Sequence, residues 1–157
     1  MRIVRILAAL LLPASLFAQL EPPPRIEPAG PPLFVVTVKG KAGFINQEGK
    51  IVIEPVFEKA FHFTDGLAAV QKEGLWGFID TSGRVVIKPQ FISVGFFSEG
   101  LATFQRKRYS DKTGYIDKTG KVVIHPQFDA AEPFRSGLAR VGFATLKGRL
   151  FGMVADV

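Results

Sequence analysis

One stretch of sequence occurs three times in this chain, at residues 43–55, 77–89 and 114–126. Each copy runs from Gly-Phe-Ile or Gly-Tyr-Ile through a short polar segment with a glycine to an aliphatic triplet and a proline. The first glycines of successive copies are 34 and 37 residues apart. This period is typical of arrayed supersecondary units, which bury their apolar faces against one another. The repeat therefore constrains the architecture more than any other feature.

Each copy has the pattern of a β-hairpin. In the second copy, the runs 78–80 and 85–87 are rich in aromatic and β-branched residues, and they flank a turn from Asp80 to Gly83. An Asp or Asn that opens a turn accepts hydrogen bonds from backbone amides, and glycine supplies the positive φ that closes it. The other copies repeat this pair as Asn46 with Gly49 and as Asp117 with Gly120.

A proline, a connection with two phenylalanines and a third apolar run complete each unit. We expect the proline (Pro55, Pro89 and Pro126) to end the second strand, because it cannot donate to a ladder. We expect the phenylalanines to fill the core; they are Phe57, Phe91 and Phe128, and then Phe63, Phe97 and Phe134. The third run has the pattern of a strand at residues 66–70, 100–104 and 137–141.

These patterns predict an all-β fold, an open array of antiparallel three-stranded repeats with about eleven strands in all. Residues 33–36 supply the leading strand of the first unit, and residues 151–154 begin a fourth hairpin that the sequence does not complete. The predicted units are about 33–65, 66–99 and 100–136, with a partial unit at 137–157. Closure into a small propeller-like or barrel-like ring is the alternative, although a propeller usually needs four or more blades.

Two segments precede the repeats. Residues 1–18 combine a basic start, an apolar run and a small residue at Ala18, which predicts a cleaved secretory signal and an exported protein. Residues 19–32 form a proline-rich linker, for which we expect extended backbone. The chain of 157 residues has no cysteine, so an exported product would depend on packing and not on disulfides. With 47% hydrophobic and 22% charged residues, the composition excludes a fibrous or wholly disordered chain.

Residues 74–91, Gly-Leu-Trp-Gly-Phe-Ile-Asp-Thr-Ser-Gly-Arg-Val-Val-Ile-Lys-Pro-Gln-Phe, resemble the WG repeat, also called the KWG repeat, of bacterial proteins. The resemblance extends over residues 33–154, although Trp76 is the only tryptophan and Ala42, Thr113 and Phe151 replace it in the other units. This resemblance implies a repeat architecture, commonly in exported or surface-associated proteins. It implies no general enzymatic reaction and no catalytic residues.

The sequence offers no convincing catalytic or metal site. His62 and His125 lie at different repeat positions without metal-ligand spacing, and Ser98 and Ser136 lack the frame of a nucleophile elbow. Asp80 and Asp117 recur at one repeat position, but Asn46 replaces them in the first unit. Turn formation therefore explains them better than acid and base catalysis. We predict no enzyme activity, no metal and no cofactor.

Positive charge concentrates in one loop. The net charge is +6, and between Arg106 and Lys121 there are six basic residues against two acidic ones. This is where the period lengthens, and insertions of this kind often carry binding. The candidate binding residues are Arg106, Lys107, Arg108, Tyr109 and Lys112. They could attract an anionic polymer of the cell envelope, whereas export disfavours nucleic acid as the partner. The interpretation that we favour is a solvated hairpin tip whose charges block edge pairing.

Aromatic side chains give a second candidate surface, at Trp76, Phe96 and Tyr109, which could stack on a sugar or a protein. For Trp76 we expect burial, because its neighbours are apolar. The leading hypothesis is an exported, non-catalytic binding or scaffold module whose partner is a protein or an envelope polymer. The alternatives are a hydrolase directed at the envelope and a structural protein that associates with itself through its unfinished last hairpin.

Overall fold

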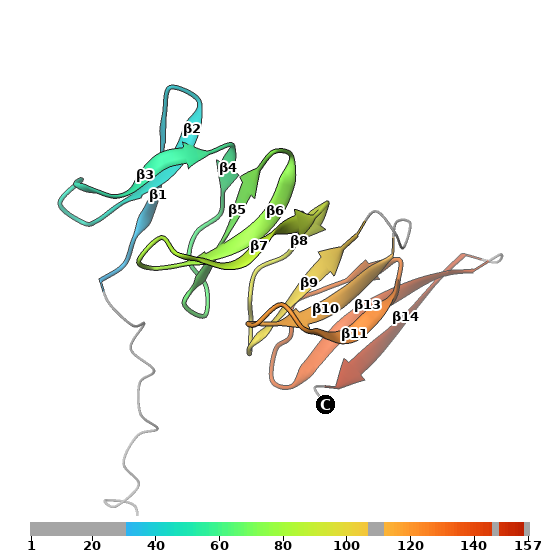
Figure 1. The fold of residues 1–157 in the computed structure, drawn as a ribbon. Coiled ribbons are helices and arrows are strands. Elements are labelled where there is room, and N and C mark those ends of the chain that lie inside the picture. The colour runs from blue at the N-terminus through green and yellow to red at the C-terminus, as the bar shows by residue number, and fades with distance from the viewer. Residues whose placement is uncertain (1–30, 107–111, 146–147, 156–157) are drawn as a thin grey trace, which may run out of the picture.

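The computed structural model describes residues 31–106, 112–145 and 148–155. Within these ranges the chain is all-β, with fourteen strands and no helix. The strands form four separate antiparallel sheets that follow one another along the chain (Figure 1). No helix in this part of the chain could span a lipid bilayer.

The sheets repeat one plan, in which each strand pairs with its neighbours in sequence. The first sheet contains β1 (Phe34–Val38), β2 (Lys41–Ile45) and β3 (Ile51–Phe57). The second contains β4 (Lys59–Ala60), β5 (Leu67–Lys72), β6 (Leu75–Asp80) and β7 (Val85–Phe91). The third contains β8 (Ser93–Val94), β9 (Leu101–Gln105), β10 (Thr113–Asp117) and β11 (Val122–Phe128). The fourth contains β12 (Ala130–Ala131), β13 (Leu138–Thr145) and β14 (Gly148–Ala155).

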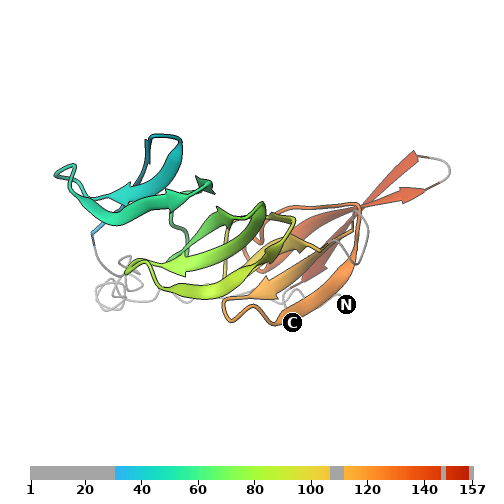
Figure 2. The same cartoon turned by 45° about the horizontal axis from the view of Figure 1, so that its top comes forward.

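The array is open, as the repeat pattern predicted. The first sheet and the last lie at opposite ends of the molecule, and the described strands do not close into a ring (Figures 1 and 2). The expected count of about eleven strands was too low. Three strands of two residues each, β4, β8 and β12, lie in the connections, where they pair with the end of the third apolar run and the residue that follows it.

The hairpin turns have the predicted chemistry. The Asp80 Oδ1 accepts hydrogen bonds from the backbone amides of Ser82 at 2.9 Å and of Arg84 at 3.1 Å. Asn46 and Asp117 accept the equivalent pairs of amide bonds in their own turns. The closing glycines, Gly49, Gly83 and Gly120, all have positive φ. The side chain that opens each turn is thus used to hold the turn.

The prediction that proline ends the second strand of each hairpin was wrong. The strands β3, β7 and β11 continue through Pro55, Pro89 and Pro126. All three are edge strands, so the missing amide proton removes no ladder bond on the outer side. The ladder also bulges here, because its register shifts between Trp76 and Phe78. In that bulge Gly77 lies so close to the edge strand that a Cβ would be 2.4 Å from the Ile87 carbonyl oxygen and 2.6 Å from the Pro89 nitrogen.

The hydrophobic cores lie between sheets and not within one sheet. Between the first two sheets, Phe44 and Phe57 pack against Ala68, Val70 and Ile79. Between the next two, the side of the second sheet that carries Leu67, Trp76 and Phe78 packs against Phe97, Ala102, Phe104 and Ile116. Between the last two, Leu101 and Tyr115 pack against Phe134, Ala139 and Val141. An interior strand therefore buries both of its faces, one toward the preceding sheet and one toward the following sheet.

The second phenylalanine of each connection packs between successive sheets, which confirms the prediction that these side chains fill the core. Phe63 packs against Phe44, Phe97 against Phe78 and Phe134 against Tyr115, with ring centroids 4.8 to 5.0 Å apart. Tyr115 also donates a hydrogen bond from its hydroxyl to the Glu132 carbonyl at 2.7 Å. Burial, together with the nearby charge of Glu132, raises the pKa of Tyr115 to about 12.

Carboxylates link the turns of successive units. The Glu99 carboxylate accepts hydrogen bonds from the amides of Ser136 and Gly137, the latter at 2.8 Å. One unit earlier, Asp65 accepts a bond from the Gly100 amide at 2.9 Å. Asp65, Glu99 and Ser136 all have positive φ and precede a glycine, so these turns are equivalent. The carboxylates of the first two turns, Asp65 and Glu99, thus each bind backbone amide groups of the next turn along the array.

Candidate functional site

The base of the basic loop is held by contacts inside the molecule. The Arg106 guanidinium lies over the rings of Phe91 and Phe104, 5.0 and 5.6 Å from their centroids. It donates a hydrogen bond to the Gln90 Oε1 at 2.7 Å. Its Nε is buried and has no hydrogen-bond partner among the described residues. Arg106 is therefore anchored on the aromatic core and is not a freely projecting cation.

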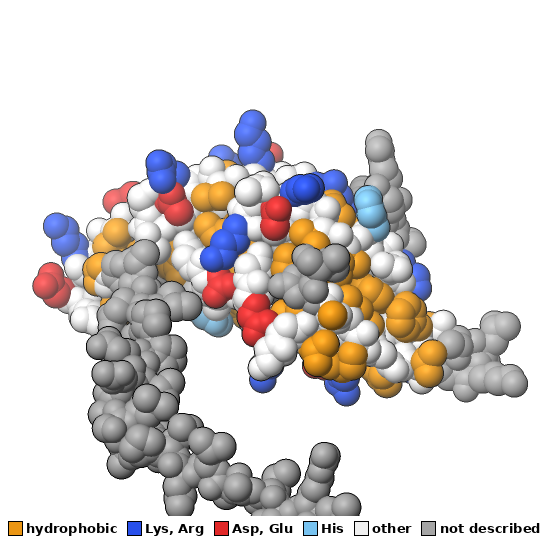
Figure 3. Space-filling view, turned by 90° about the horizontal axis from the view of Figure 1, so that it is seen from below, with side chains coloured by type: hydrophobic (Ala, Val, Ile, Leu, Met, Phe, Trp, Pro, Cys, Tyr) orange, Lys and Arg blue, Asp and Glu red, His pale blue; other side chains and the backbone are white. Residues whose placement is uncertain are grey.

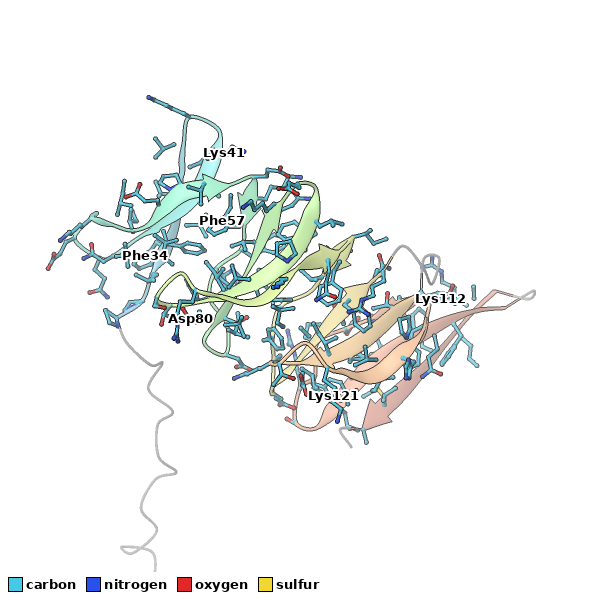
Figure 4. The ribbon with its side chains drawn as sticks, in the orientation of Figure 1. Phe34, Lys41, Phe57, Asp80, Lys112 and Lys121 are labelled. Carbon is cyan, nitrogen blue, oxygen red and sulfur yellow. The ribbon has the colours of Figure 1, made fainter. Side chains whose placement is uncertain are left out.

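Lys112 at the other end of the loop is paired as well. Its Nζ lies 2.7 Å from the Asp129 Oδ1, and the Asp129 Oδ2 accepts the backbone amide of Ala144 at 2.6 Å. The Ala144 amide, and then Lys112, lower the pKa of Asp129 below its ordinary value. Lys112 therefore ties the base of the loop to the last sheet. Figure 4 places Lys112 at one edge of the array and the hairpin turns of Asp80 and Lys121 at the other.

Lys107, Arg108 and Tyr109, the remaining candidates of the basic loop, lie outside the described residues. The equivalent connection in the second sheet is a short turn at Glu73 and Gly74, whose amides bond to the Glu58 carboxylate at 3.0 and 2.9 Å. One period later, Ile92 replaces Glu58, and an isoleucine cannot accept these bonds. In the third unit the longer basic loop thus takes the place of the short turn, and Ile92 takes the place of the carboxylate that binds it.

Trp76 is buried, as expected, with 9% of its surface exposed. Its indole stacks on the ring of Phe61, with centroids 4.8 Å apart and an interplanar angle of 3°. Phe61 lies in the connection between β4 and β5. A ring stacked on Trp76 in this way covers one face of the indole, so that face is closed to an external ligand.

The stack continues into a cluster of four rings that joins two units. Phe96, from the connection between β8 and β9, lies edge-on to Phe61 at 5.3 Å, and His62 lies 4.7 Å from Phe96. We call Phe61, His62, Trp76 and Phe96 the aromatic ladder. Phe61 and Phe96 are each 37% exposed, and His62 is exposed. The ladder therefore presents aromatic surface from the side chains of two consecutive units.

Sequence reasoning identified two members of the ladder, Trp76 and Phe96, and missed the contact that organises them. Phe61 corresponds to Gly95 and Glu132 in the following units, so the repeat pattern does not mark it as special. His62 likewise corresponds to Phe96. The signal available was the Phe-His-Phe run at residues 61–63, which places three aromatic side chains in one connection.

The groups considered for chemistry have structural partners. Asp80 bonds to Ser82 and Arg84, and the Ser82 hydroxyl above all lowers the pKa of its carboxyl to about 2. The pKa of Asp117 is lowered in the same way, chiefly by Thr119. The Ser98 hydroxyl donates to the Phe134 carbonyl at 2.7 Å, across the third core. No group of three or more metal-ligating side chains occurs among the described residues.

Two hollows lie on the described surface. One, of about 280 Å³, is bounded by β8, β9 and β12 and contains a single carboxylate, that of Asp129. The other, of about 470 Å³, lies beside the turn between β5 and β6 and contains Lys72, Lys88 and, again, one carboxylate, that of Glu73. Neither hollow brings together the two acidic groups that glycoside hydrolysis commonly uses.

The comparison with protein families agrees with the repeat pattern. The model of a family described as "WG containing repeat" matches residues 43–76, 76–107 and 114–142, which is more than half of the chain. No curated protein and no solved structure matches. The matched segments include the Gly77 bulge, the Asp80 turn and Trp76.

Proposed function

The chain belongs to the family of WG-containing repeat proteins, and on that premise we propose that it is an exported, non-catalytic module that binds a protein through the aromatic ladder. The observation that carries the proposal is the exposure of Phe61 and Phe96 in a cluster fixed from behind by Trp76. Export is part of the proposal because residues 1–18 have the pattern of a secretory signal.

The ladder suits binding because its rings are already ordered. Phe61 is held by the buried indole, and Phe96 is held between Phe61 and His62. Side chains that are immobilised before association lose little conformational entropy on binding. Aromatic residues are also enriched at the energetic centres of protein interfaces.

A protein fits the ladder better than a glycan does. Sugars stack on open ring faces, and Trp76, the largest ring, has one face covered by Phe61 and little exposed surface. What remains accessible is the outer surface of Phe61, His62 and Phe96, two of them apolar. Such a surface fits apolar side chains of a partner protein. An anionic envelope polymer is the alternative, with Arg106 and Lys112 less available because both have internal partners.

The absence of a catalytic role is supported by how the recurring acidic groups are used. Asp80 and Asp117 hold their own turns, whereas Asp65 and Glu99 hold the turns of the next unit. A hydrolase would need at least two acidic groups that converge on a substrate. Each described hollow contains only one.

The test compares Phe96→Ser with Ile92→Ser. The two residues are equally exposed, 37% and 39%, and lie close together in the chain, but only Phe96 belongs to the ladder. The full chain and each variant are immobilised and exposed to envelope extract, and a retained protein is then purified and titrated. We expect the Phe96→Ser variant to bind it at least about tenfold more weakly and the Ile92→Ser variant to bind it normally.

Three outcomes would contradict the proposal. If the immobilised chain retains no protein or polymer from the extract at micromolar concentration, the proposed binding function is wrong. Equal loss with both serine variants would remove the ladder as the site. Retention of a protease-resistant polymer, lost at high salt or when Arg106, Lys107 and Arg108 are neutralised, would favour the polymer instead.

A further inference from the structure

The outer face of the last sheet exposes large apolar side chains. Leu138 on β13 is 44% exposed, and Phe151 and Met153 on β14 are 53% and 61% exposed. Figure 3 shows hydrophobic side chains gathered toward the end of the molecule that holds these strands. We call Leu138, Phe151 and Met153 the C-terminal face. Exposed clusters of this kind commonly mark interaction sites.

The same positions are buried in the second sheet. In the second sheet, Phe78 pairs with Ala69 and Trp76 pairs with Gln71. In the last sheet, Met153 pairs with Arg140 and Phe151 pairs with Gly142. Met153 is thus equivalent to Phe78, and Phe151 is equivalent to Trp76. Leu67, Trp76 and Phe78 are only 7%, 9% and 1% exposed, because the third sheet packs on them. The C-terminal face is therefore the side of a repeat that packs against a following repeat.

The first sheet carries the complementary side. Ala68, Val70 and Ile79 are the residues by which the second sheet covers the first. Ala68 pairs with Ile79 in the second sheet, and Phe34 pairs with Ile45 in the first. Phe34, Val36 and Ile45 are therefore equivalent to Ala68, Val70 and Ile79. Phe34 is 49% exposed, and Val36 and Ile45 are half-buried. We call Phe34, Val36 and Ile45 the N-terminal face.

We propose that a second copy of this chain docks head to tail, so that its N-terminal face covers the C-terminal face of the first copy. The contact continues the interface that already joins the four sheets, with one copy's first sheet in the place of a following unit. The two faces lie at opposite ends of the array (Figures 1 and 4), so one copy can use both at once. A heterologous contact of this kind produces open chains or rings of copies and not a closed pair.

Two substitutions make this contact different from the interior ones. Phe34 stands where the other units have an alanine. Its larger side chain suits the described part of the last sheet, which has no strand equivalent to β7 and so offers no side chains in the places of Ile87 and Phe91. Arg140 replaces Ala69, where its guanidinium lies over the Phe151 ring at 5.2 Å and its Nε donates to Glu132 at 2.9 Å. Arg140 lies on the C-terminal face, directly opposite Met153, so a docked copy must cover or displace its charge. Desolvating a charge weakens the contact, and we therefore expect reversible association.

The test is sedimentation velocity of the purified full chain over a range of concentrations. We expect the wild type to form dimers and longer species as the concentration rises. Met153→Glu and Phe34→Glu should each weaken association at least about tenfold, because a carboxylate would be buried in the contact. Val85→Glu is the control, since Val85 is 53% exposed in a sheet that has neighbours on both faces. Phe96→Ser should associate normally, so failure here is separable from failure of the aromatic ladder.

Mixing the two glutamate variants decides the geometry. The Met153→Glu chain keeps its N-terminal face and the Phe34→Glu chain keeps its C-terminal face, so an equimolar mixture should form a dimer and nothing longer. If Phe34→Glu alone still dimerises and mixing adds nothing, the copies pair through β14 edges and the proposal is wrong. It is equally wrong if the wild type is monomeric at all concentrations, or if it associates only after residues 19–32 are deleted, which would assign the C-terminal face to that segment.

Discussion

The hairpin of β5 and β6 and the hairpin of β13 and β14 have the same register, but only the first has a described neighbouring unit on both faces. In the second sheet, Phe78 is covered by the Phe97 ring of the next unit at 4.8 Å, whereas Met153 at the same position of the last sheet is 61% exposed. The other faces of both hairpins are buried against the preceding sheet, as the burial of Val70 on β5 and of Val141 on β13 shows. The comparison teaches that a residue of this repeat is buried by its neighbouring unit and not by its own sheet.

Two glycines extend the comparison to the backbone. Gly77 lies against β7, and a Cβ there would be 2.4 Å from the Ile87 carbonyl oxygen. Gly152 occupies the same position in β14, where the nearest atom to a Cβ is a Phe143 ring carbon at 3.9 Å. The last sheet has no described strand on that side of β14. The requirement for glycine in the interior repeats therefore comes from the edge strand that crosses the bulge.

The largest expected difference is between Phe78→Ala and Met153→Ala. Removing the buried Phe78 ring leaves a cavity in the second core, and we expect a loss of about 3–5 kcal/mol in the free energy of unfolding. Met153→Ala should change it by less than about 0.5 kcal/mol. Urea unfolding followed by circular dichroism, at a concentration where the chain is monomeric, measures both. Similar losses would mean that the C-terminal face is already covered within one chain.

A smaller difference is expected between Gly77→Ala and Gly152→Ala. The methyl group at residue 77 would collide with backbone atoms of β7, which can yield only if the bulge opens, so we expect destabilisation of about 1–3 kcal/mol or more. At residue 152 the methyl group has room, and a change within about 0.5 kcal/mol is expected. The same urea titration compares them. A tolerated alanine at residue 77 would show that the close approach of β7 is not needed for stability.

The sequence predicted those features of the fold whose interacting residues all lie within one unit. The turns at Asn46, Asp80 and Asp117 depend on residues within five positions of one another, and their chemistry was correct. The proline prediction failed because it considered the lost amide alone. An edge strand with a bulge leaves that position without an outer partner, and edge status depends on how strands are ordered.

The candidate site was less predictable because it depends on contacts between units. The sequence indicated that Trp76 would be buried, but it gave no sign that Phe61 would be the ring stacked on it. Arg106 and Lys112 were identified by their charge, and their partners Gln90, Phe91 and Asp129 lie 15 to 17 residues away in sequence. Such pairs are set by the spacing of sheets, which a local charge pattern does not contain. The part of the basic loop from Lys107 to Tyr109 keeps its predicted role as an untested hypothesis.

The smallest expected effect concerns pH, and it separates the first sheet from the interior sheets. The first sheet opens its turn with Asn46, which does not titrate, whereas the second uses Asp80, whose pKa is lowered from 3.8 to about 2 by its bonds to Ser82 and Arg84. A carboxylate with a lowered pKa stabilises the folded chain above its unfolded pKa, and this contribution is lost as the pH falls from about 4 to about 2. Asp80→Asn should therefore lower the free energy of unfolding at pH 7 and approach the wild type near pH 2, whereas Asn46→Asp should make the wild-type curve steeper over that range. Urea unfolding at several pH values measures this, and parallel curves for Asp80→Asn and the wild type would mean that the Asp80 bonds contribute nothing that depends on its charge.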